Sequence, residues 1–437
     1  MIQVREYATI TTATHSEPSL DRGIVSEETF DWLIELNEGM KNSFKLLVVQ
    51  NHQELKLNSY VGYIQSPNGE GIEILPKTGL GQDNPEDSRA ILQKVLMSSL
   101  QLEAKEYGAA KLNRTRLPIH EWIFKQFLDQ LKLLVSRGLR HDYDRVEEEA
   151  RFIRGQLNIA AQQRQPPGKA HLFHIRHDVY SPNRIENRLI KTALSYVKKF
   201  CKSAENWRLA NELSHYLDVI PEVESPMSHF HQWQNTKLMQ PYNAIKPWCR
   251  LLLEQLNPSF QKGRFSGITL LFPMEQLFEN HVTACLQSQV SAGSKVLQQR
   301  SSMYLLTHTP EGSDVTGEWF QLKPDLLLSN IGSDQVLDIK WKLLDADENT
   351  TDKKYNISQS DLYQLFAYGH KYQNGTGNMM LIYPKHRGFA QPLPMFSYSP
   401  ELHLWVVPFC IEDDCLMRGD WEGHFASLSN LELKDIA

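Results

Sequence analysis

The fold of the C-terminal part of this chain is decided by two apolar segments, Leu322-Lys-Pro-Asp325-Leu-Leu-Leu328 and Val336-Leu-Asp338-Ile-Lys340-Trp-Lys342, each of which carries an aspartate. Between them lies Gly332-Ser-Asp334, a turn signal, so the two segments are predicted to form a β-hairpin. Such a hairpin would bring the two carboxylates together. Within the second segment, Asp338 and Lys340 are two residues apart, and the period of a strand places both side chains on one face.

An aspartate and a lysine between Leu337 and Ile339 are unusual for a buried strand, because a buried charge is costly unless it is paired or bound to a metal. A metal site explains the pattern. Two carboxylates can hold one or two Mg²⁺ ions, with the carbonyl of Ile339 as a further oxygen ligand. Bound Mg²⁺ activates a water and stabilises a leaving oxygen, and Lys340 can orient or help deprotonate that water. Asp325, Asp338 and Lys340 thus have the layout of a PD-(D/E)xK nuclease, although a plain hairpin with solvated charges is the competing interpretation.

Two flanking segments favour the nuclease interpretation. Met274-Glu275-Gln-Leu-Phe-Glu279 is predicted to be helical, and Glu279 resembles the first-motif glutamate of this nuclease superfamily, with Glu275 one turn earlier as its rival. After the hairpin, Gln364 and Tyr368 are spaced i, i+4 and share a helix face. Their spacing resembles the Gln-x-x-x-Tyr helix of RecB-like nucleases, which implies that they brace the site and contact the DNA backbone. Lys342 is expected on the Lys340 face, either near a phosphate or as a solvated strand end.

The rest of the chain predicts an α+β protein of several domains. Residues 1–85 are rich in predicted strands, interrupted by one helix that starts at Ser26. Residues 86–255 are mainly helical, with apolar residues at helical spacing. Residues 256–437 alternate helices with strands, including candidate strands at 320–328 and 335–342, and form the predicted nuclease core of restriction-endonuclease type.

Composition excludes several other classes of protein. The 437 residues include 46 Lys+Arg and 52 Asp+Glu, a net charge of −6 that gives no support to DNA binding. No apolar run is long enough for a membrane span, and the N-terminal residues do not read as a secretory signal. The five scattered cysteines indicate reduced thiols and a cytoplasmic protein.

Further motifs, taken in order, resemble those of the McrC family, the nuclease subunit of McrBC-type modification-dependent (type IV) restriction systems. They are Val61-Gly-Tyr-Ile64 with Ile72-Glu-Ile-Leu-Pro-Lys77, Arg137-Gly-Leu-Arg-His-Asp-Tyr143 with Arg154-Gly-Gln-Leu157, and Asn183-Arg-Ile-Glu-Asn-Arg188 with the helix that follows. The acid before Lys340 in the catalytic motif is an aspartate, which the superfamily allows.

The resemblance implies a partner and a mechanism. McrC docks on a ring of McrB, a hexameric AAA+ GTPase that reads methylcytosine, and stimulates its GTP hydrolysis; DNA is cut after translocation. By this resemblance, residues 1–85 are a docking module and residues 256–437 cut double-stranded modified DNA with Mg²⁺. This chain has no GxxxxGK[ST] motif of its own, which fits a partner that supplies the motor. An arginine or lysine on a loop of the first two segments would stimulate the GTPase.

Two alternatives remain at this point. The chain could be a self-sufficient RecB-like DNA repair nuclease, or a non-enzymatic adaptor with a relic nuclease fold. The intact set of Asp325, Asp338 and Lys340 disfavours the adaptor. Pairing of two nuclease domains, or of two whole complexes, is a further expectation for double-strand cleavage.

Overall fold

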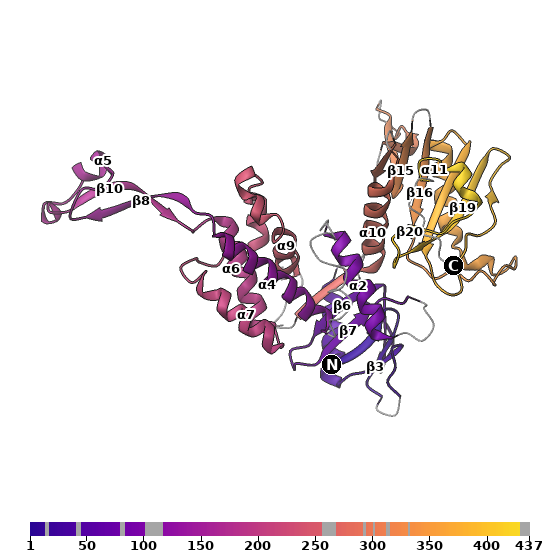
Figure 1. Cartoon of the computed structure of the whole chain (residues 1–437), viewed down its shortest axis with the longest axis horizontal. Helices are drawn as coiled ribbons and strands as arrows, with labels where there is room; N and C mark the ends of the chain where they lie inside the picture. Colours follow the sequence, from indigo (N-terminus) through magenta and orange to yellow (C-terminus); the bar gives the residue numbers. More distant parts are fainter. Residues whose placement is uncertain are drawn as a thin grey trace. The chain divides into compact units, whose positions relative to one another are not determined.

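The computed structural model describes residues 1–13, 17–40, 45–78, 84–100, 117–255, 268–291, 294–299, 302–311, 315–330 and 333–428. Gly332, in the predicted turn, lies outside these ranges. The chain forms two compact units, one made of Met1–Arg116 with Leu270–Ala437, the other of Leu117–Thr269 (Figure 1). The first unit therefore combines the two ends of the sequence. None of the helices among the described residues is both long and apolar enough to cross a membrane.

Among its described residues, the N-terminal part of the first unit has two four-stranded sheets and two helices. One sheet has the order β1 (Ile2–Arg5), β7 (Gly71–Leu75), β6 (Tyr60–Gln65), β11 (Ile268–Pro273), and the other β3 (Arg22–Ile24), β2 (Thr9–Thr11), β5 (Glu54–Leu57), β4 (Leu47–Asn51). The helices are α1 (Glu27–Gly39) and α2 (Pro85–Ser99). As predicted, Ser26 caps α1, because its side chain accepts a hydrogen bond from the backbone N–H of Thr29.

Gly62, in the β6 sequence Val61-Gly-Tyr-Ile64, lies where the backbone of β11 comes very close. Its φ is +130°, and a Cβ at this position would lie 2.0 Å from the carbonyl oxygen of Leu270. Only glycine permits strand β6 to approach β11 this closely.

A seven-stranded sheet forms the C-terminal part of the first unit. Its order is β12 (Lys295–Gln298), β15 (Leu326–Asn330), β16 (Ser333–Ile339), β17 (Gly377–Pro384), β19 (Leu402–Cys410), β18 (Phe396–Ser397), with β20 (Cys415–Leu416) paired to β19. The predicted hairpin is confirmed: β15 and β16 are antiparallel, and Leu326 lies opposite Leu337. Strands β16, β17 and β19 run parallel, which makes the central part of the sheet an α/β core.

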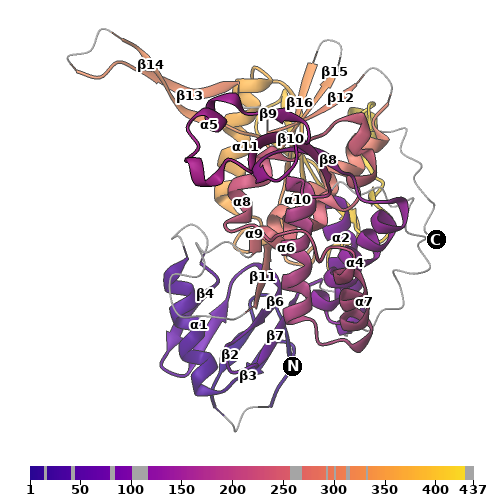
Figure 2. The same ribbon diagram turned by 90° about the vertical axis from the view of Figure 1, so that its left-hand side faces the viewer.

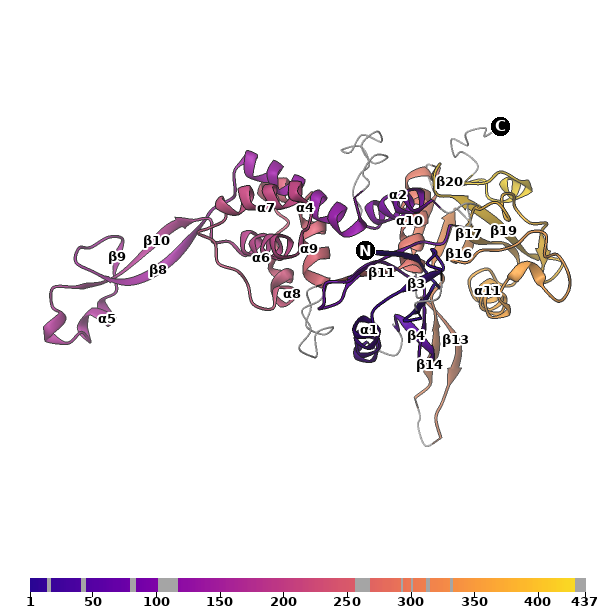
Figure 3. The same cartoon turned by 90° about the horizontal axis from the view of Figure 1, so that it is seen from below.

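Helices α10 (Met274–Gln289) and α11 (Gln359–Tyr372) cover opposite faces of this sheet (Figure 3). On the α11 face, Leu365 and Tyr368 belong to one apolar cluster with Leu327 and Val336. On the other face, Phe278 of α10 stacks edge-on against Phe409 of β19. The strand period thus directs Val336 and Asp338 towards α11.

The predicted strand at 320–328 is wrong, because two strands share these residues. Strands β13 (Met303–His308) and β14 (Gly317–Leu322) form a separate ribbon that extends away from the main sheet (Figure 2). Pro324, which has no N–H to donate to a strand ladder, lies between β14 and β15 and separates them. Short 3₁₀ helices at Lys354–Asn356 and Asp420–His424 complete the first unit.

The second unit is a helical body from which a β-hairpin extends (Figure 1). Its helices are α4 (Ile119–Arg137), α5 (Ile159–Gln163), α6 (Ile185–Phe200), α7 (Ala204–His215), α8 (Pro226–His229) and α9 (Lys246–Gln255), with 3₁₀ turns at Pro167–Lys169, Phe230–Gln232 and Lys237–Tyr242. Its strands are β8 (Asp142–Ala150), β9 (Gln156–Leu157) and β10 (Phe173–Ser181). The body is helical as predicted, but strand β8 was not predicted.

Strand β8 gives no sequence signal because it has no apolar face. Its residues are exposed or half-buried throughout, and among the described strands it pairs with β10 alone. Ion pairs across the two strands, such as Arg176 with Glu147 at 2.5 Å, take the place of apolar packing.

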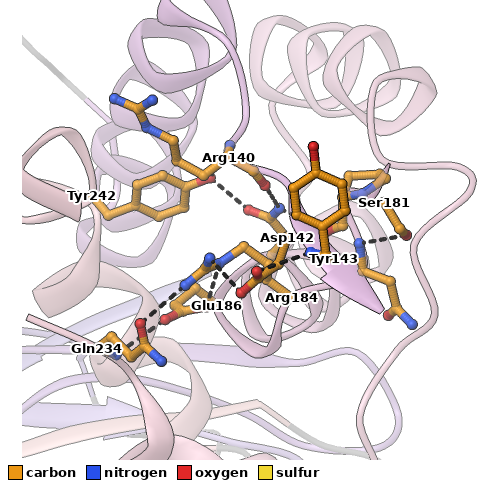
Figure 4. A network of polar contacts seen from close by, with 11 residues as sticks. Arg140, Asp142, Tyr143, Ser181, Arg184, Glu186, Gln234 and Tyr242 are labelled. Atoms are coloured by element: carbon orange, nitrogen blue, oxygen red, sulfur yellow. Dashed lines mark hydrogen bonds and ion pairs between the residues drawn. The ribbon is translucent and has the colours of Figure 1, made fainter. Parts of the chain in front are cut away.

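A polar network, part of it buried, fixes the base of this hairpin to the helical body (Figure 4). Arg184 donates to Asp142 at 2.9 Å and to Glu186 at 3.3 Å. The amide of Asn187, which is fully buried, donates to the carbonyls of Arg140 and Pro182 and accepts from the hydroxyl of Tyr242 at 2.7 Å. Both ends of the hairpin are therefore tied to helix α6.

We expect Asn187→Ala to loosen the base of the hairpin, because the buried carbonyls and hydroxyl lose their partner, at a cost of about 2–4 kcal/mol. The measurement is amide hydrogen exchange of β8 and β10, which should become faster in the variant. The control is Asn211→Ala, since Asn211 bonds only to an exposed carbonyl of its own helix. Unchanged exchange in Asn187→Ala would show that the network does not hold the hairpin.

Candidate metal centre

The two predicted carboxylates and the lysine meet at one edge of the seven-stranded sheet. Asp325 directly precedes β15, Asp338 is the penultimate residue of β16, and Lys340 follows that strand; the antiparallel pairing brings these ends together. The ammonium of Lys340 lies 2.7 Å from Oδ2 of Asp338 and 3.9 Å from Oδ2 of Asp325. Asp325 Oδ2 also accepts a hydrogen bond from the backbone N–H of Ile339 at 2.8 Å.

Burial dominates the electrostatics of this group. It raises the pKa of Asp338, and the nearby carboxylate of Asp325 raises it further; the pKa of Asp325 is raised by burial as well. Burial alone would lower the pKa of Lys340, but the two carboxylates raise it above its usual range. Without a further cation, the site thus holds more negative charge than the fold accommodates easily.

The residues fit a hard divalent cation. Asp338 is fully buried, and its Oδ1 accepts no hydrogen bond from the described residues. Asp325 and Lys340 line a cavity of about 630 Å³, together with Ile339, whose carbonyl is a further oxygen donor in this region. An unpaired carboxylate oxygen beside such a cavity is the type of ligand that Mg²⁺ prefers.

Both candidate glutamates of α10 line the same cavity, but in different surroundings. Burial and then Asp325 raise the pKa of Glu279, and Gln299 donates to its Oε1 at 3.1 Å. Glu275 instead accepts from Ser59 at 3.4 Å. Glu279 is therefore the glutamate on the side of Asp325.

Gln364 and Tyr368 share a face of α11, as predicted from their spacing. Gln364 donates to the hydroxyl of Tyr368 at 2.6 Å, and that hydroxyl donates to the carbonyl of Lys323 at 2.9 Å. Neither residue lines the cavity. They brace the segment that leads into Asp325, whereas contact with DNA stays a prediction.

Two residues of the cavity lining, Lys342 and Asp361, have surroundings that the sequence did not predict. Lys342 lines the cavity but lies beyond the end of β16, and its ammonium donates to the carbonyl of Asn356. Asp361 was not singled out, yet it lines the cavity and acts on the pKa of both Asp338 and Lys340. Its position on α11, three and seven residues before Gln364 and Tyr368, was the signal that could have identified it.

The N-terminal segment also contributes to this cavity, which sequence reasoning did not predict. Glu6, Tyr7 and Lys77 line it together with Trp341. Glu6 is fully buried, and its Oε1 accepts hydrogen bonds from the backbone N–H of Lys77 at 2.8 Å and from the indole N–H of Trp341 at 2.7 Å. A carboxyl from the first strand region therefore joins the loop after β7 to the residue after Lys340.

A second group of metal-ligating side chains has a structural explanation. His281, Cys285 and Asp414 place one ligand atom each within 4.8 Å of one another. However, the ammonium of Lys94 lies 2.9 Å from Asp414, and Ser98 hydrogen-bonds to His281 at 2.8 Å. Lys94 already supplies the positive charge that a metal would bring, so we assign this group to the packing of α2 against α10.

Comparison with known proteins identifies the family. The model of the McrBC 5-methylcytosine restriction system component family matches residues 55–384. The chain belongs to this family. The resemblance to McrC is thereby confirmed. A search of curated proteins gave no match.

Two solved structures share the fold. One is a refined half-complex from the tetradecameric assembly of Thermococcus gammatolerans McrB AAA+ hexamers with bound McrC, with a TM-score of 0.68, 18% identity, and coverage of 98% of this chain and 99% of that chain. The other is the cryo-EM structure of the T. gammatolerans McrBC complex, with a TM-score of 0.50, 21% identity, and coverage of 65% and 86%.

The surroundings of Glu6 predict a pH dependence of stability. Burial raises its pKa from 4.5 to about 7, assisted by Glu275, while the bonds from Lys77 and Trp341 and the charge of Lys77 act in the opposite direction. The folded state therefore favours the protonated form, and stability that is present below pH 4.5 is lost as the pH rises to about 7.

Glu6→Gln keeps the acceptor oxygen but cannot ionise. We expect this variant to be more stable than wild type above pH 7, by about 1–3 kcal/mol, and to lose this advantage near pH 5. Chemical denaturation at pH 5, 6, 7 and 8 measures the difference. A constant difference across this range would contradict the pKa assigned to Glu6.

Proposed function

We propose that this chain is the DNA endonuclease subunit of a GTP-driven, modification-dependent restriction complex, with a PD-(D/E)xK nuclease core in its C-terminal part. The observation that carries the proposal is the cluster of Asp325, Asp338 and Lys340, whose unpaired buried oxygen lies at the end of a sheet built on a β-hairpin. The McrBC family assignment supports it independently, since that family's description is that of a restriction system component.

In this proposal Asp325, Asp338 and the carbonyl of Ile339 hold Mg²⁺. The ion, when bound, supplies an activated water and neutralises charge on the scissile phosphate. The ammonium of Lys340, held by Asp338 at 2.7 Å, belongs to a residue that lines the cavity and orients the attacking water. Glu279 fixes the water network on the side of Asp325, and Gln364 with Tyr368 keeps the Asp325 segment in place.

The partner is proposed to be a hexameric AAA+ GTPase of the McrB type, because one similar solved structure holds McrB AAA+ hexamers with bound McrC and the other is an McrBC complex. The β8–β10 hairpin of the second unit is the best candidate for docking. Beyond β8, Phe152 and Ile153 are 67% and 56% exposed, and Ile159 is 63% exposed. Apolar side chains at the end of a projection held by a rigid base are typical of a segment that inserts into a partner.

A self-sufficient nuclease in DNA repair is the second candidate, and it makes a different prediction. Such an enzyme would cut without GTP and without a ring. The acidic composition of this chain favours the complex, because a subunit that is held on DNA by a partner needs no basic surface of its own.

We expect Asp338→Asn to abolish cleavage of modified DNA by the reconstituted complex, with a loss of at least about 1,000-fold, because a metal ligand is removed. Stimulation of the partner's GTPase should remain. The variant should also lose the rise in thermal stability that Mg²⁺ gives the wild-type chain by binding its folded state.

The matched control is Asp334→Asn, an aspartate of the same strand that lies opposite Ser329, towards the other end of the hairpin. It should cleave and respond to Mg²⁺ as wild type does. Normal cleavage by the Asp338 variant would refute the proposed site, and efficient cleavage by the wild-type chain without GTP would favour the repair nuclease.

The hairpin proposal is tested by replacing Phe152 and Ile153 with alanine. Loss of two apolar anchors should weaken association with the ring by about tenfold or more, and GTPase stimulation should fall in parallel. Val219→Ala, at a side chain that is 79% exposed elsewhere on this unit, is the control. Full stimulation by the double variant would exclude the hairpin end as the docking segment.

A further inference from the structure

The N-terminal segment supplies a cation to the candidate nuclease cavity. The lining contains five carboxylates and three lysines, and of these lysines only Lys77 comes from the N-terminal segment, in the loop after β7. A cavity that receives a DNA strand needs cations to offset the phosphates. Lys340 is paired with Asp338, and Lys342 donates to the carbonyl of Asn356. Of the three lysines, Lys77 is therefore the best candidate to bind a phosphate next to the metal.

Glu6 determines where Lys77 lies. The same oxygen, Oε1, accepts from the backbone N–H of Lys77 and from the indole N–H of Trp341. Trp341 directly follows Lys340, and its ring packs against Phe278 of α10 with centroids 5.1 Å apart. Two bonds to one buried oxygen thus hold the loop after β7 at the end of β16.

The second oxygen of Glu6 is a further observation that bears on ligand binding in this region. Oε2 is buried and accepts no hydrogen bond from the described residues. A buried carboxylate oxygen without a donor costs free energy, so a cation or donor that reached it would be stabilised. Burial, the largest cause, raises the pKa of Glu6 to about 7, and the charge of Lys77 acts in the opposite direction.

We infer that Lys77 binds a phosphate of the DNA strand that enters the nuclease cavity, and that Glu6 is the positioning residue that holds Lys77 beside Lys340. The inference rests on the proposed nuclease function and extends it to the N-terminal segment, which the sequence suggested as a docking module only. It also gives a role to the Leu75-Pro-Lys77 motif.

Backbone and side chain of Lys77 can be separated experimentally. Lys77→Met keeps the N–H that Glu6 accepts, so the fold is preserved while the ammonium is lost. Lys77→Arg retains the charge. Lys56→Met, at an exposed lysine of β5 in the same part of the molecule, is the matched control.

The experiment measures single-turnover DNA cleavage by the full complex with GTP and Mg²⁺ at several salt concentrations. Lys77→Met should cut about tenfold more slowly, and the slope of log rate against log salt concentration should fall by about one. Lys77→Arg should retain most of the rate, and Lys56→Met all of it. GTPase stimulation and the thermal shift with Mg²⁺ should remain at wild-type values in all three.

A rate and salt slope equal to wild type in Lys77→Met would overturn the inference while leaving the proposed nuclease intact, provided that Asp338→Asn is inactive. Loss of the Mg²⁺ thermal shift in Lys77→Met would overturn it too, since Lys77 would then be needed for the fold of the site. If Asp338→Asn cuts normally, it is the proposed function that fails. Binding of a short DNA duplex to the isolated chain with Ca²⁺, measured by fluorescence anisotropy, tests Lys77 independently of cleavage.

The positioning role of Glu6 is tested by a double-mutant cycle. Glu6→Ala frees Lys77 and should slow cleavage by a similar factor, whereas Glu6→Gln, which keeps the acceptor, should cut as wild type does near neutral pH. Because both residues act through one phosphate contact, Glu6→Ala with Lys77→Met should be no slower than either alone. Multiplicative losses in the double variant would show that Glu6 does not act through Lys77.

Discussion

The burial of Asp338 is the constraint on which the rest of the first unit depends. Its carboxylate is fully buried at the end of a central strand, where an isolated charge would be very costly. Lys340 offsets this cost by an ion pair at 2.7 Å. Burial disfavours the charge of Lys340 as well, and the two aspartates stabilise that charge in turn. Asp325 is in turn fixed by the backbone of Ile339. Each group is stabilised by the next, and the net charge that remains is negative.

This arrangement places requirements on both faces of the sheet. On one face, Tyr368 holds the carbonyl of Lys323 and so prevents the Asp325 segment from moving away from its like-charged neighbour. On the other, Phe278 packs against Trp341 and fixes the residue that follows Lys340. Apolar packing and hydrogen bonds thus hold together a cluster that electrostatics alone would disperse. Proteins retain such local conflicts at functional sites, where a ligand removes them.

The parts of the structure that could be predicted from the sequence are those whose residues lie close along the chain. Asp338 and Lys340 follow from the period of one strand, and Asp325 joins them through a hairpin whose register requires only a short turn. Asp361 could have been found from the period of α11. By contrast, the bond between Glu6 and Trp341 spans 335 residues, and nothing near Glu6 in the sequence indicates where its side chain points. Strand β8 was missed for a different reason, since it is stabilised by ion pairs and has no apolar alternation.

The sequence motifs that resemble the McrC family have different physical roles in the two units. Around Asn187, arginine, asparagine and tyrosine groups form the base of the hairpin, where each buried polar group must be paired. Around Lys77, the motif lies at the cavity, where a charge is useful only if it stays available to a ligand. Since the cavity lining is rich in carboxylates, it repels DNA until cations enter. In the proposed complex, such a chain would capture DNA poorly by its own charge and would act on a strand that the partner delivers.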